Sequence, residues 1–256
     1  MKEFAKHIIT TKKGFANLFF VGQAGFILRS KTGKLLGIDL YLSDCVEKLE
    51  GHIGFKRLQP KLLEASDLQY DYLIATHPHY DHLDVDSAQE LIFNCYRNFY
   101  ASVNCEQEIK SIGIGASIIK YVKPGDSFAD ENFTIDIIKC DHGTGAPDAF
   151  GCIVETAGKR IVFVGDTCLR KDWKDEYLKK GPIDILVAPI NGAYGNLSET
   201  DCARLSKILT PRLTIPCHYG MFASHGGNPQ KFMTAMKTTC PGNKYTLMAM
   251  GDYITL

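Results

Sequence analysis

The stretch His77-Pro78-His79-Tyr80-Asp81-His82 places three of the eight histidines of this 256-residue chain within six positions. It follows directly on the apolar run 72–76, which we predict to be a strand, so these side chains stand where the chain leaves a sheet. Imidazole nitrogens and carboxylate oxygens bind cations such as zinc at about 2.0–2.2 Å. Two imidazoles two residues apart can reach one cation together, while Asp81 and His82 turn toward a second. A polar surface loop is the weaker interpretation of so dense a pattern.

Three further ligand candidates each follow a predicted strand elsewhere in the chain. Alone, each could be a hydrogen-bonded core or capping residue. Together they supply one ligand for each strand end, which is the pattern that a shared site requires, and we therefore predict a dinuclear metal site. The three candidates are His142 after residues 133–140, Asp166 after residues 160–164 and His218 after residues 214–217.

The composition is that of an ordinary globular protein without a strong charge. Apolar residues make up 45% of the chain, and 29 Lys and Arg balance 29 Asp and Glu. A neutral chain gives no sign of a bulk attraction to nucleic acid or to an anionic membrane. No apolar run approaches the roughly 20 residues of a membrane helix, and residues 1–7 lack the layout of a secretory signal. We expect a cytoplasmic protein with a small-molecule substrate, no nucleic-acid partner and no membrane partner.

The nine cysteines form no Cys-x-x-Cys pair, and their number is odd. Reduced thiols that serve as small core residues explain this better than a disulfide framework or a structural zinc knuckle. Cys168 lies three residues after Gly165 and offers a thiolate ligand. We nevertheless expect a structural role for Cys168.

The chain shows no internal repeat and no long linker, so we expect one domain over residues 1–256. Strands come first, then helix and strand alternate, and the scheme is repeated. Two such halves, each a sheet backed by helices, would form an α/β protein of the four-layer αββα sandwich type, although periodicity alone does not exclude a doubly wound sheet. The expected elements are hairpins of 26–29 with 35–39 and of 151–156 with 160–164, strands at 72–76, 133–138, 183–189, 213–216 and 245–250, and helices from Asp86 (with Gln89 as a capping-box-like partner), over 200–209 and over 229–237.

The ligand pattern, in its order and spacing, resembles the successive metal motifs of the metallo-β-lactamase superfamily over nearly the whole chain. The resemblance implies the fold of that superfamily and a metal-dependent hydrolase with two divalent ions. At the third strand end, either Asp141 or His142 fits the position of the ligand. Carried over by position, His77, His79 and His142 would hold the first metal, Asp81, His82 and His218 the second, and Asp166 would bridge them.

Within the superfamily, the chain is most similar to the L-ascorbate-6-phosphate lactonase branch. The shared segments are 21–26, 56–60, 75–85, 122–126 and 215–218, of which 56–60 is unusual in the wider superfamily. This likeness implies a lactonase that acts on a phosphorylated sugar acid lactone through a hydroxide between the metals, with Asp81 orienting that hydroxide. The branch suggests manganese and the superfamily as a whole suggests zinc. The chain is shorter than members of the branch between His142 and Asp166 and at its C-terminus.

Substrate-binding residues are predicted on weaker patterns. Lys56 and Arg57 either bind a sugar phosphate or form a solvated basic turn. His225 follows a ligand in a glycine-containing loop and could donate a proton to a substrate oxygen. Tyr194 and Tyr219 flank ligand loops and are candidates for the same role.

Two aspartates are candidates for orienting a metal-binding histidine, since such a histidine usually donates its free N–H to a carboxylate. Asp39 ends a predicted strand and would otherwise begin a turn, and Asp84 would otherwise lead into a helix. The alternative function is a metal-dependent phosphodiesterase acting on nucleotides or RNA, for which the neutral charge gives no sign of a basic exosite. A non-catalytic binding protein is disfavoured because every expected ligand is present. A homo-oligomer is left open.

Overall fold

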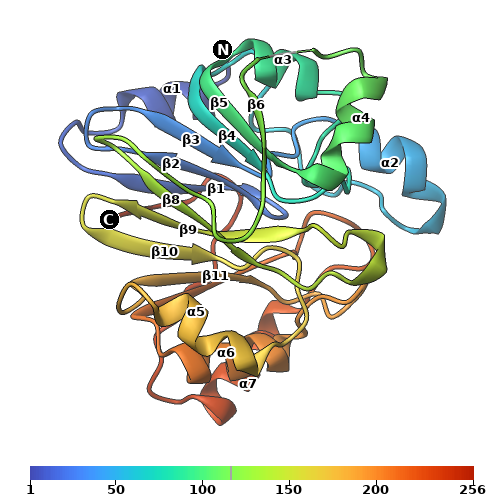
Figure 1. Ribbon diagram of the computed structural model, residues 1–256. Helices are drawn as coiled ribbons and strands as arrows, with labels where there is room; N and C mark the ends of the chain where they lie inside the picture. The colour runs from blue at the N-terminus through green and yellow to red at the C-terminus, as the bar shows by residue number, and fades with distance from the viewer. Residues whose placement is uncertain (116) are drawn as a thin grey trace.

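Two mixed β-sheets pack face to face in the computed structural model, which describes residues 1–115 and 117–256 (Figure 1). The first sheet has seven strands in the order β13-β1-β2-β3-β4-β5-β6, and the second has six in the order β12-β11-β10-β9-β8-β7. The strands of the first sheet are β1 (Asn17–Gly22), β2 (Gly25–Arg29), β3 (Leu35–Ile38), β4 (Tyr70–Ala75), β5 (Cys95–Ser102), β6 (Ile119–Val122) and β13 (Tyr253–Thr255). Those of the second are β7 (Ser127–Ala129), β8 (Thr134–Lys139), β9 (Phe150–Thr156), β10 (Lys159–Phe163), β11 (Ile185–Pro189) and β12 (Leu213–Cys217).

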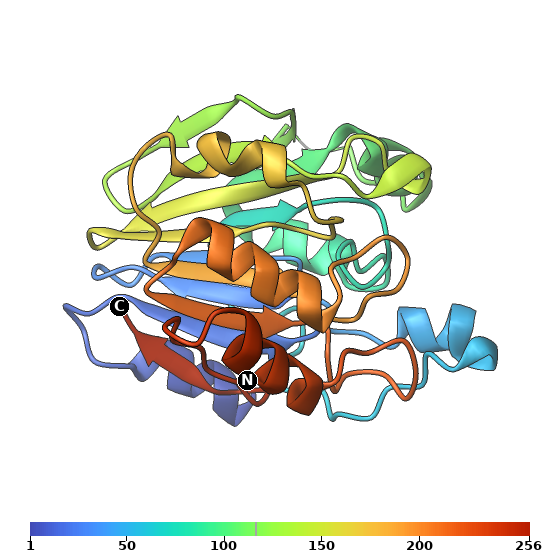
Figure 2. The ribbon, with the colours of Figure 1, turned by 90° about the horizontal axis from the view of Figure 1, so that it is seen from below.

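Helices cover the outer face of each sheet. The helices are α1 (Glu3–Thr10), α2 (Cys45–Glu50), α3 (Ala88–Phe93), α4 (Glu106–Ser111), α5 (Lys174–Leu178), α6 (Glu199–Leu209) and α7 (Pro229–Thr239). Buried side chains of α1, α3 and α4 pack on the first sheet, and those of α5, α6 and α7 pack on the second, as Figures 1 and 2 show. This is the predicted four-layer αββα sandwich, and the prediction is confirmed.

The alternation of side chains along the strands explains the layers. On β1, Leu18 and Phe20 point to the core between the sheets, whereas Phe19 and Val21 point to the helices outside. All four are at most 2% exposed. A strand that is apolar on both faces must be covered on both, because successive side chains point to opposite sides of a sheet. The sequence therefore requires a helical layer on the far side of each sheet.

Both predicted hairpins and the helices over 200–209 and 229–237 are present, the helices as α6 and α7. The helix expected from Asp86 begins at Ala88 instead, and Ser87 at its start makes no capping bond through its side chain. Asp84 accounts for this difference, since its carboxylate accepts the backbone N–H of Ser87 and its carbonyl accepts that of Ala88. The turn before the helix is thus organised around Asp84 and not around a capping box.

The predicted strand at 245–250 is wrong. Only Tyr245 makes an isolated bridge, to Thr214, and the C-terminal strand is β13, which pairs with β1. The backbone near Met248 is bonded to a side chain: the Tyr219 hydroxyl accepts from its N–H and donates to its carbonyl, at 2.9 and 2.7 Å. None of the helices within residues 1–115 and 117–256 is both long enough and apolar enough to cross a bilayer.

Candidate metal centre

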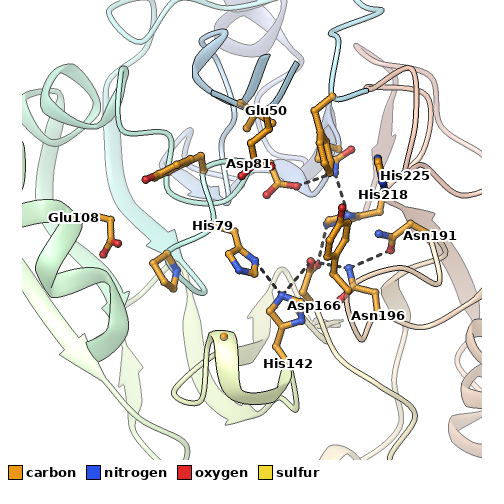
Figure 3. A pocket seen from close by; sticks show the side chains of 17 residues that line it. Glu50, His79, Asp81, Glu108, His142, Asp166, Asn191, Asn196, His218 and His225 are labelled. Atoms are coloured by element: carbon orange, nitrogen blue, oxygen red, sulfur yellow. Dashed lines mark hydrogen bonds and ion pairs between the residues drawn. The ribbon is translucent and has the colours of Figure 1, made fainter. Parts of the chain in front are cut away.

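The predicted ligands converge where strands of the two sheets end. The segment 77–82 follows β4, His142 follows β8, and Asp166 follows β10. His218 directly follows β12, which runs parallel to β11 and β10. Because the carboxyl ends of parallel strands share one edge of a sheet, side chains from distant parts of the chain meet there. Figure 3 shows five of these ligands around one pocket.

Three histidines form the first ligand group. The Nδ1 atom of His79 lies 2.9 Å from Nε2 of His77 and 3.1 Å from Nε2 of His142. Ring nitrogens at these separations repel one another unless a proton or a cation lies among them. Neutral imidazoles are the preferred ligands of divalent transition metals. The group therefore fits one metal ion.

The second group joins His82 and His218 with two carboxylates. The two Nε2 atoms lie 3.2 Å apart, and Nε2 of His218 lies 2.9 Å from Oδ1 of Asp166. Asp81 lies on the other side, with its Oδ2 3.9 Å from His82 Nε2. Asp81, His82 and His218 also form one of the three clusters whose ligand atoms lie within 4.8 Å of one another.

Asp166 connects the two groups. Its Oδ1 faces His82 and His218, at 3.4 and 2.9 Å, while its Oδ2 lies 3.9 Å from Nε2 of His142. A carboxylate with one oxygen directed at each ligand group is what a bridging ligand requires. The structure thus brings all seven predicted residues together in two adjoining groups that could hold metal ions.

The pKa shifts keep two of the imidazoles neutral and the Asp166 carboxylate ionised, which are the charge states that metal binding needs. Burial lowers the pKa of His77 well below its usual value and that of His142 to about 4, so both imidazoles are neutral at pH 7. Burial would raise the pKa of the Asp166 carboxyl, but the neighbouring His218 and His82 hold it well below its usual range. Burial likewise opposes a charge on His82, yet Asp166, Asp39 and Asp81 raise the pKa of its imidazole well above the usual value. A surplus of negative charge thus surrounds His82, as expected where a cation is to be bound.

Asp39 orients His82 as predicted. Its Oδ2 lies 2.8 Å from His82 Nδ1, and its two oxygens accept the backbone N–H and the hydroxyl of Thr76 at 2.8 and 2.7 Å. The contact directs Nε2 of His82 toward the second ligand group. Asp84 does not have this role: it accepts backbone N–H bonds from Leu42 and Ser43 and so holds the loop after β3.

The choice between Asp141 and His142 is decided by where each side chain points. The Asp141 carboxylate accepts a hydrogen bond from Arg170 at 2.8 Å, which lowers its pKa, whereas His142 joins His77 and His79. Cys168 belongs to none of the ligand clusters found in the described part of the chain. Burial raises the pKa of its thiol, so a thiolate is disfavoured.

Two amides that the sequence-based prediction overlooked hold the carboxylate ligands. Gln23 donates to Oδ2 of Asp81 at 2.8 Å and lies 3.1 Å from Nδ1 of His218. Asn196 donates to Oδ2 of Asp166 at 2.7 Å and also contacts Asn191. Gln23 lies within the segment 21–26 that carried the resemblance, which was the available signal. Asn196 had no such signal, because it lies in the irregular loop after β11.

The backbone around the site is unusually strained. Gln23, Asp39 and His218 all have positive φ, of 54°, 47° and 62°, a conformation that costs non-glycine residues about 1–3 kcal/mol and concentrates at functional sites. Gly165, just before Asp166, has φ of 70°, and a Cβ there would lie 2.8 Å from the Phe150 carbonyl oxygen. Only glycine can therefore bring Asp166 this close to β9.

Comparison with known proteins identifies the family of this chain. A family model described as the beta-lactamase superfamily domain matches residues 40–219, a span that includes every ligand named above. The chain belongs to the metallo-β-lactamase superfamily. It is 28% identical over 222 residues to a protein named UPF0173 metal-dependent hydrolase from Thermofilum pendens, covering 81% of this chain and 92% of that one.

Further likenesses agree. A protein of the same name from Staphylococcus aureus is 24% identical over 237 residues, covering 86% of this chain and 92% of its own length. The solved structure of a metallo hydrolase from the archaeon Ignicoccus hospitalis shares the fold, with a TM-score of 0.71, 19% identity, and coverage of 94% and 98%. The prediction of a hydrolytic enzyme of the metallo-β-lactamase superfamily is confirmed.

The candidate metal centre of this superfamily member opens into a pocket of about 360 Å³. Of the predicted substrate residues, Tyr194 and His225 line it, and Figure 3 shows His225 beside His218. Lys56, Arg57 and Tyr219 are not among its lining residues. The residues not predicted that line it include Glu50, Phe55 and Glu108.

The three predicted residues that do not line the pocket have other surroundings. Arg57 lies over the Tyr41 ring and donates to the carbonyls of Ser43 and Gln59, so its guanidinium is committed to the fold. Lys56 is exposed. Tyr219 is bonded through its hydroxyl to Met248. The positive charge of residues 56 and 57, and the nearness of Tyr219 to a ligand loop, did not predict where these side chains lie.

Proposed function

We propose that this chain hydrolyses a small carboxylic ester or lactone with two divalent cations, zinc or manganese. One observation carries the proposal: the two oxygens of Asp166 face two separate ligand groups, and both groups border the same pocket. His77, His79 and His142 would hold one cation, Asp81, His82 and His218 the other, and Asp166 both. When bound, such cations supply Lewis-acid polarisation of a carbonyl and lower the pKa of a bound water toward about 7.

The chain's own residues position the reactants. Asp81 is fixed by the Gln23 amide and would orient the attacking water. The Nδ1 atom of His225 lies 2.6 Å from the Ser224 hydroxyl, an interaction that leaves Nε2 free for the substrate. His225 would donate a proton to the leaving group from that atom, and Tyr194 would donate a hydrogen bond to a substrate oxygen.

The phosphorylated substrate implied by the lactonase branch is not part of this proposal. No Lys or Arg is among the residues that line the pocket in the described chain, and these are the side chains best suited to bind a phosphate group. That the protein lies in the cytoplasm and binds no nucleic acid and no membrane stays a prediction, and whether it forms a homo-oligomer stays open.

The first test is the metal content of the purified protein, followed by assays with added zinc or manganese. We expect about two ions per chain and turnover of p-nitrophenyl butyrate or a simple lactone. Turnover of bis-p-nitrophenyl phosphate alone would assign the reaction to the phosphodiesterase class. Turnover of L-ascorbate 6-phosphate in preference to neutral lactones would show that the substrate is a phosphorylated lactone. The absence of any turnover with two ions bound would overturn the proposal.

A matched pair of variants tests the ligand assignment. His142→Ala should lose about one ion per chain and most of the activity, because it removes one of three nitrogens from the first group. Asp141→Ala should keep both ions, since its carboxylate contacts Arg170. If Asp141→Ala lost the ion instead, the assignment of the third strand end would be reversed.

A further inference from the structure

Two carboxylates line the pocket without a partner. Glu50 ends α2, and Glu108 lies in α4. Figure 3 places Glu50 next to Asp81 and Glu108 across the pocket from His225. Neither side chain makes an ion pair or a hydrogen bond with any residue that the structure describes, and Oε2 of Glu108 is buried with no partner. A buried, unpaired carboxylate oxygen is costly unless a cation or donor reaches it.

Neighbouring glutamates show that this is particular to the pocket. Glu106, in the same helix as Glu108, pairs with Lys110 at 2.7 Å. Glu47, in the same helix as Glu50, accepts the backbone N–H of Arg57 at 2.8 Å. Neither glutamate of the pocket belongs to a metal-ligand cluster, so metal ligation does not explain them. Their carboxylates are left to act on what enters the pocket.

Three rings form an aromatic wall on the same pocket. Phe55 and His225 are stacked, with centroids 4.5 Å apart and planes at 8°. Tyr194 lies 6.0 Å from Phe55 and 5.4 Å from His225 and is 57% exposed. Tyr194 and His225 both have positive φ, of 53° and 63°, so this wall is built on strained backbone of the kind found at functional sites. The faces of Tyr and Phe rings attract cations.

We propose that the pocket selects substrates that carry a positively charged amine or ammonium group, bound by the Phe55 and Tyr194 rings of the aromatic wall together with Glu50 and Glu108. The inference rests on the proposed function, because it names the substrate class of the same site. Carboxylates and aromatic faces together recognise an ammonium group, whereas an anionic substrate would meet repulsion from both glutamates. The absence of Lys and Arg from the lining of the described pocket agrees with this preference.

The test uses three butyrate esters of nearly equal shape and different charge. They are the choline ester, its neutral 3,3-dimethylbutyl isostere and the anionic 2-sulfoethyl ester, with acid release followed by pH-stat titration of the metal-loaded protein. We expect kcat/KM to fall in that order, by roughly tenfold between the cationic and neutral esters. Equal kcat/KM for the cationic and neutral esters would overturn the inference.

Variants connect the preference to the two glutamates. Glu50→Gln combined with Glu108→Gln should lower the cationic-to-neutral ratio of kcat/KM by about tenfold, while the control Glu106→Gln should keep the wild-type ratio. Metal content is measured in each protein. Loss of metal from the double variant with an unchanged ratio would show that the carboxylates balance the charge of the ions and would overturn the inference.

Binding without turnover separates the two proposals. Benzyltrimethylammonium and benzenesulfonate are titrated calorimetrically into the metal-loaded protein and the double variant. Ammonium binding that is weakened in the double variant, with no ester hydrolysed, would uphold the charge preference and overturn the hydrolase proposal. Hydrolysis of all three esters at equal rates, with no ammonium binding, would uphold the hydrolase proposal and overturn the charge preference.

Discussion

The floor of the pocket and its rim are built in different ways. We call the seven metal-ligand candidates the floor, of which all but His77 and His82 line the pocket, and we call Glu50, Phe55, Glu108, Tyr194 and His225 the rim. His77 is wholly buried and Asp166 is 4% exposed, whereas Tyr194 is 57% exposed. Floor residues follow strands of the two sheets, while rim residues lie in short helices or loops.

The difference separates the chemistry from the choice of substrate. Ligands at strand ends inherit the rigidity of the sandwich, and partners such as Asp39 and Asn196 fix their direction. A metal site needs this precision, because small displacements of a ligand weaken binding. Rim residues have few such bonds. Changes at the rim residues Glu50, Phe55 and Glu108 should therefore alter which substrate is hydrolysed, while changes in the floor should abolish hydrolysis.

Asp166→Ala should have the largest effect of any single change. It removes the carboxylate whose two oxygens face both ligand groups, so that Nε2 of His218 loses an acidic neighbour at 2.9 Å and Nε2 of His82 loses one at 3.4 Å. We expect loss of at least one ion per chain and a fall in kcat/KM of roughly a thousandfold or more. The control is Asp175→Ala, an exposed aspartate of α5. The metal content and the rate of ester hydrolysis are measured for both variants. Two retained ions with full activity in Asp166→Ala would remove the distinction between floor and rim.

Asn196→Ala should have an intermediate effect, since Asn196 touches the floor without being a ligand. Its amide donates to Asp166, and loss of such a bond weakens metal affinity by about 10–100-fold. Activity should fall when metal is limiting and return when metal is in excess. Titration with zinc in the presence of a competing chelator measures the shift. Asn94→Ala, whose amide bonds within its own turn to Glu90, is the control. Activity that excess metal does not restore would assign Asn196 a direct role in the reaction.

The floor could be predicted from the sequence because each ligand follows an apolar strand. The chain need only end a strand there for the fold to bring the side chains together. The rim could not be predicted in this way. Phe55 and His225 are 170 positions apart, and their stacking depends on how two loops approach each other. The amides Gln23 and Asn196 reach the ligands from irregular segments, where no periodicity fixes direction.

The same reason explains why Lys56 and the segment 245–250 have other surroundings than the sequence suggested. Lys56 follows the rim residue Phe55 in sequence but does not line the pocket. Arg57 donates to backbone carbonyls and lies over the Tyr41 ring. The apolar run at 245–250 has the composition of a strand, but its backbone is bonded to Tyr219. In both cases a local pattern was correct about residue type and could not specify the tertiary partner.

The smallest effect on activity is expected from substitution of Lys56. This substitution tests whether the rim of the pocket ends at Phe55. Lys56→Ala should leave kcat/KM for every charged ester within about twofold, because a solvated lysine outside the pocket contributes little. Arg57→Ala should act on the fold, since its side chain is only 6% exposed and donates to Ser43 and Gln59. We expect it to lower the free energy of unfolding by about 1–3 kcal/mol, measured by urea denaturation. A rise in KM for the anionic ester alone in Lys56→Ala, with unchanged stability, would show that Lys56 contacts the substrate. The rim would then include residue 56 and carry a positively charged side chain.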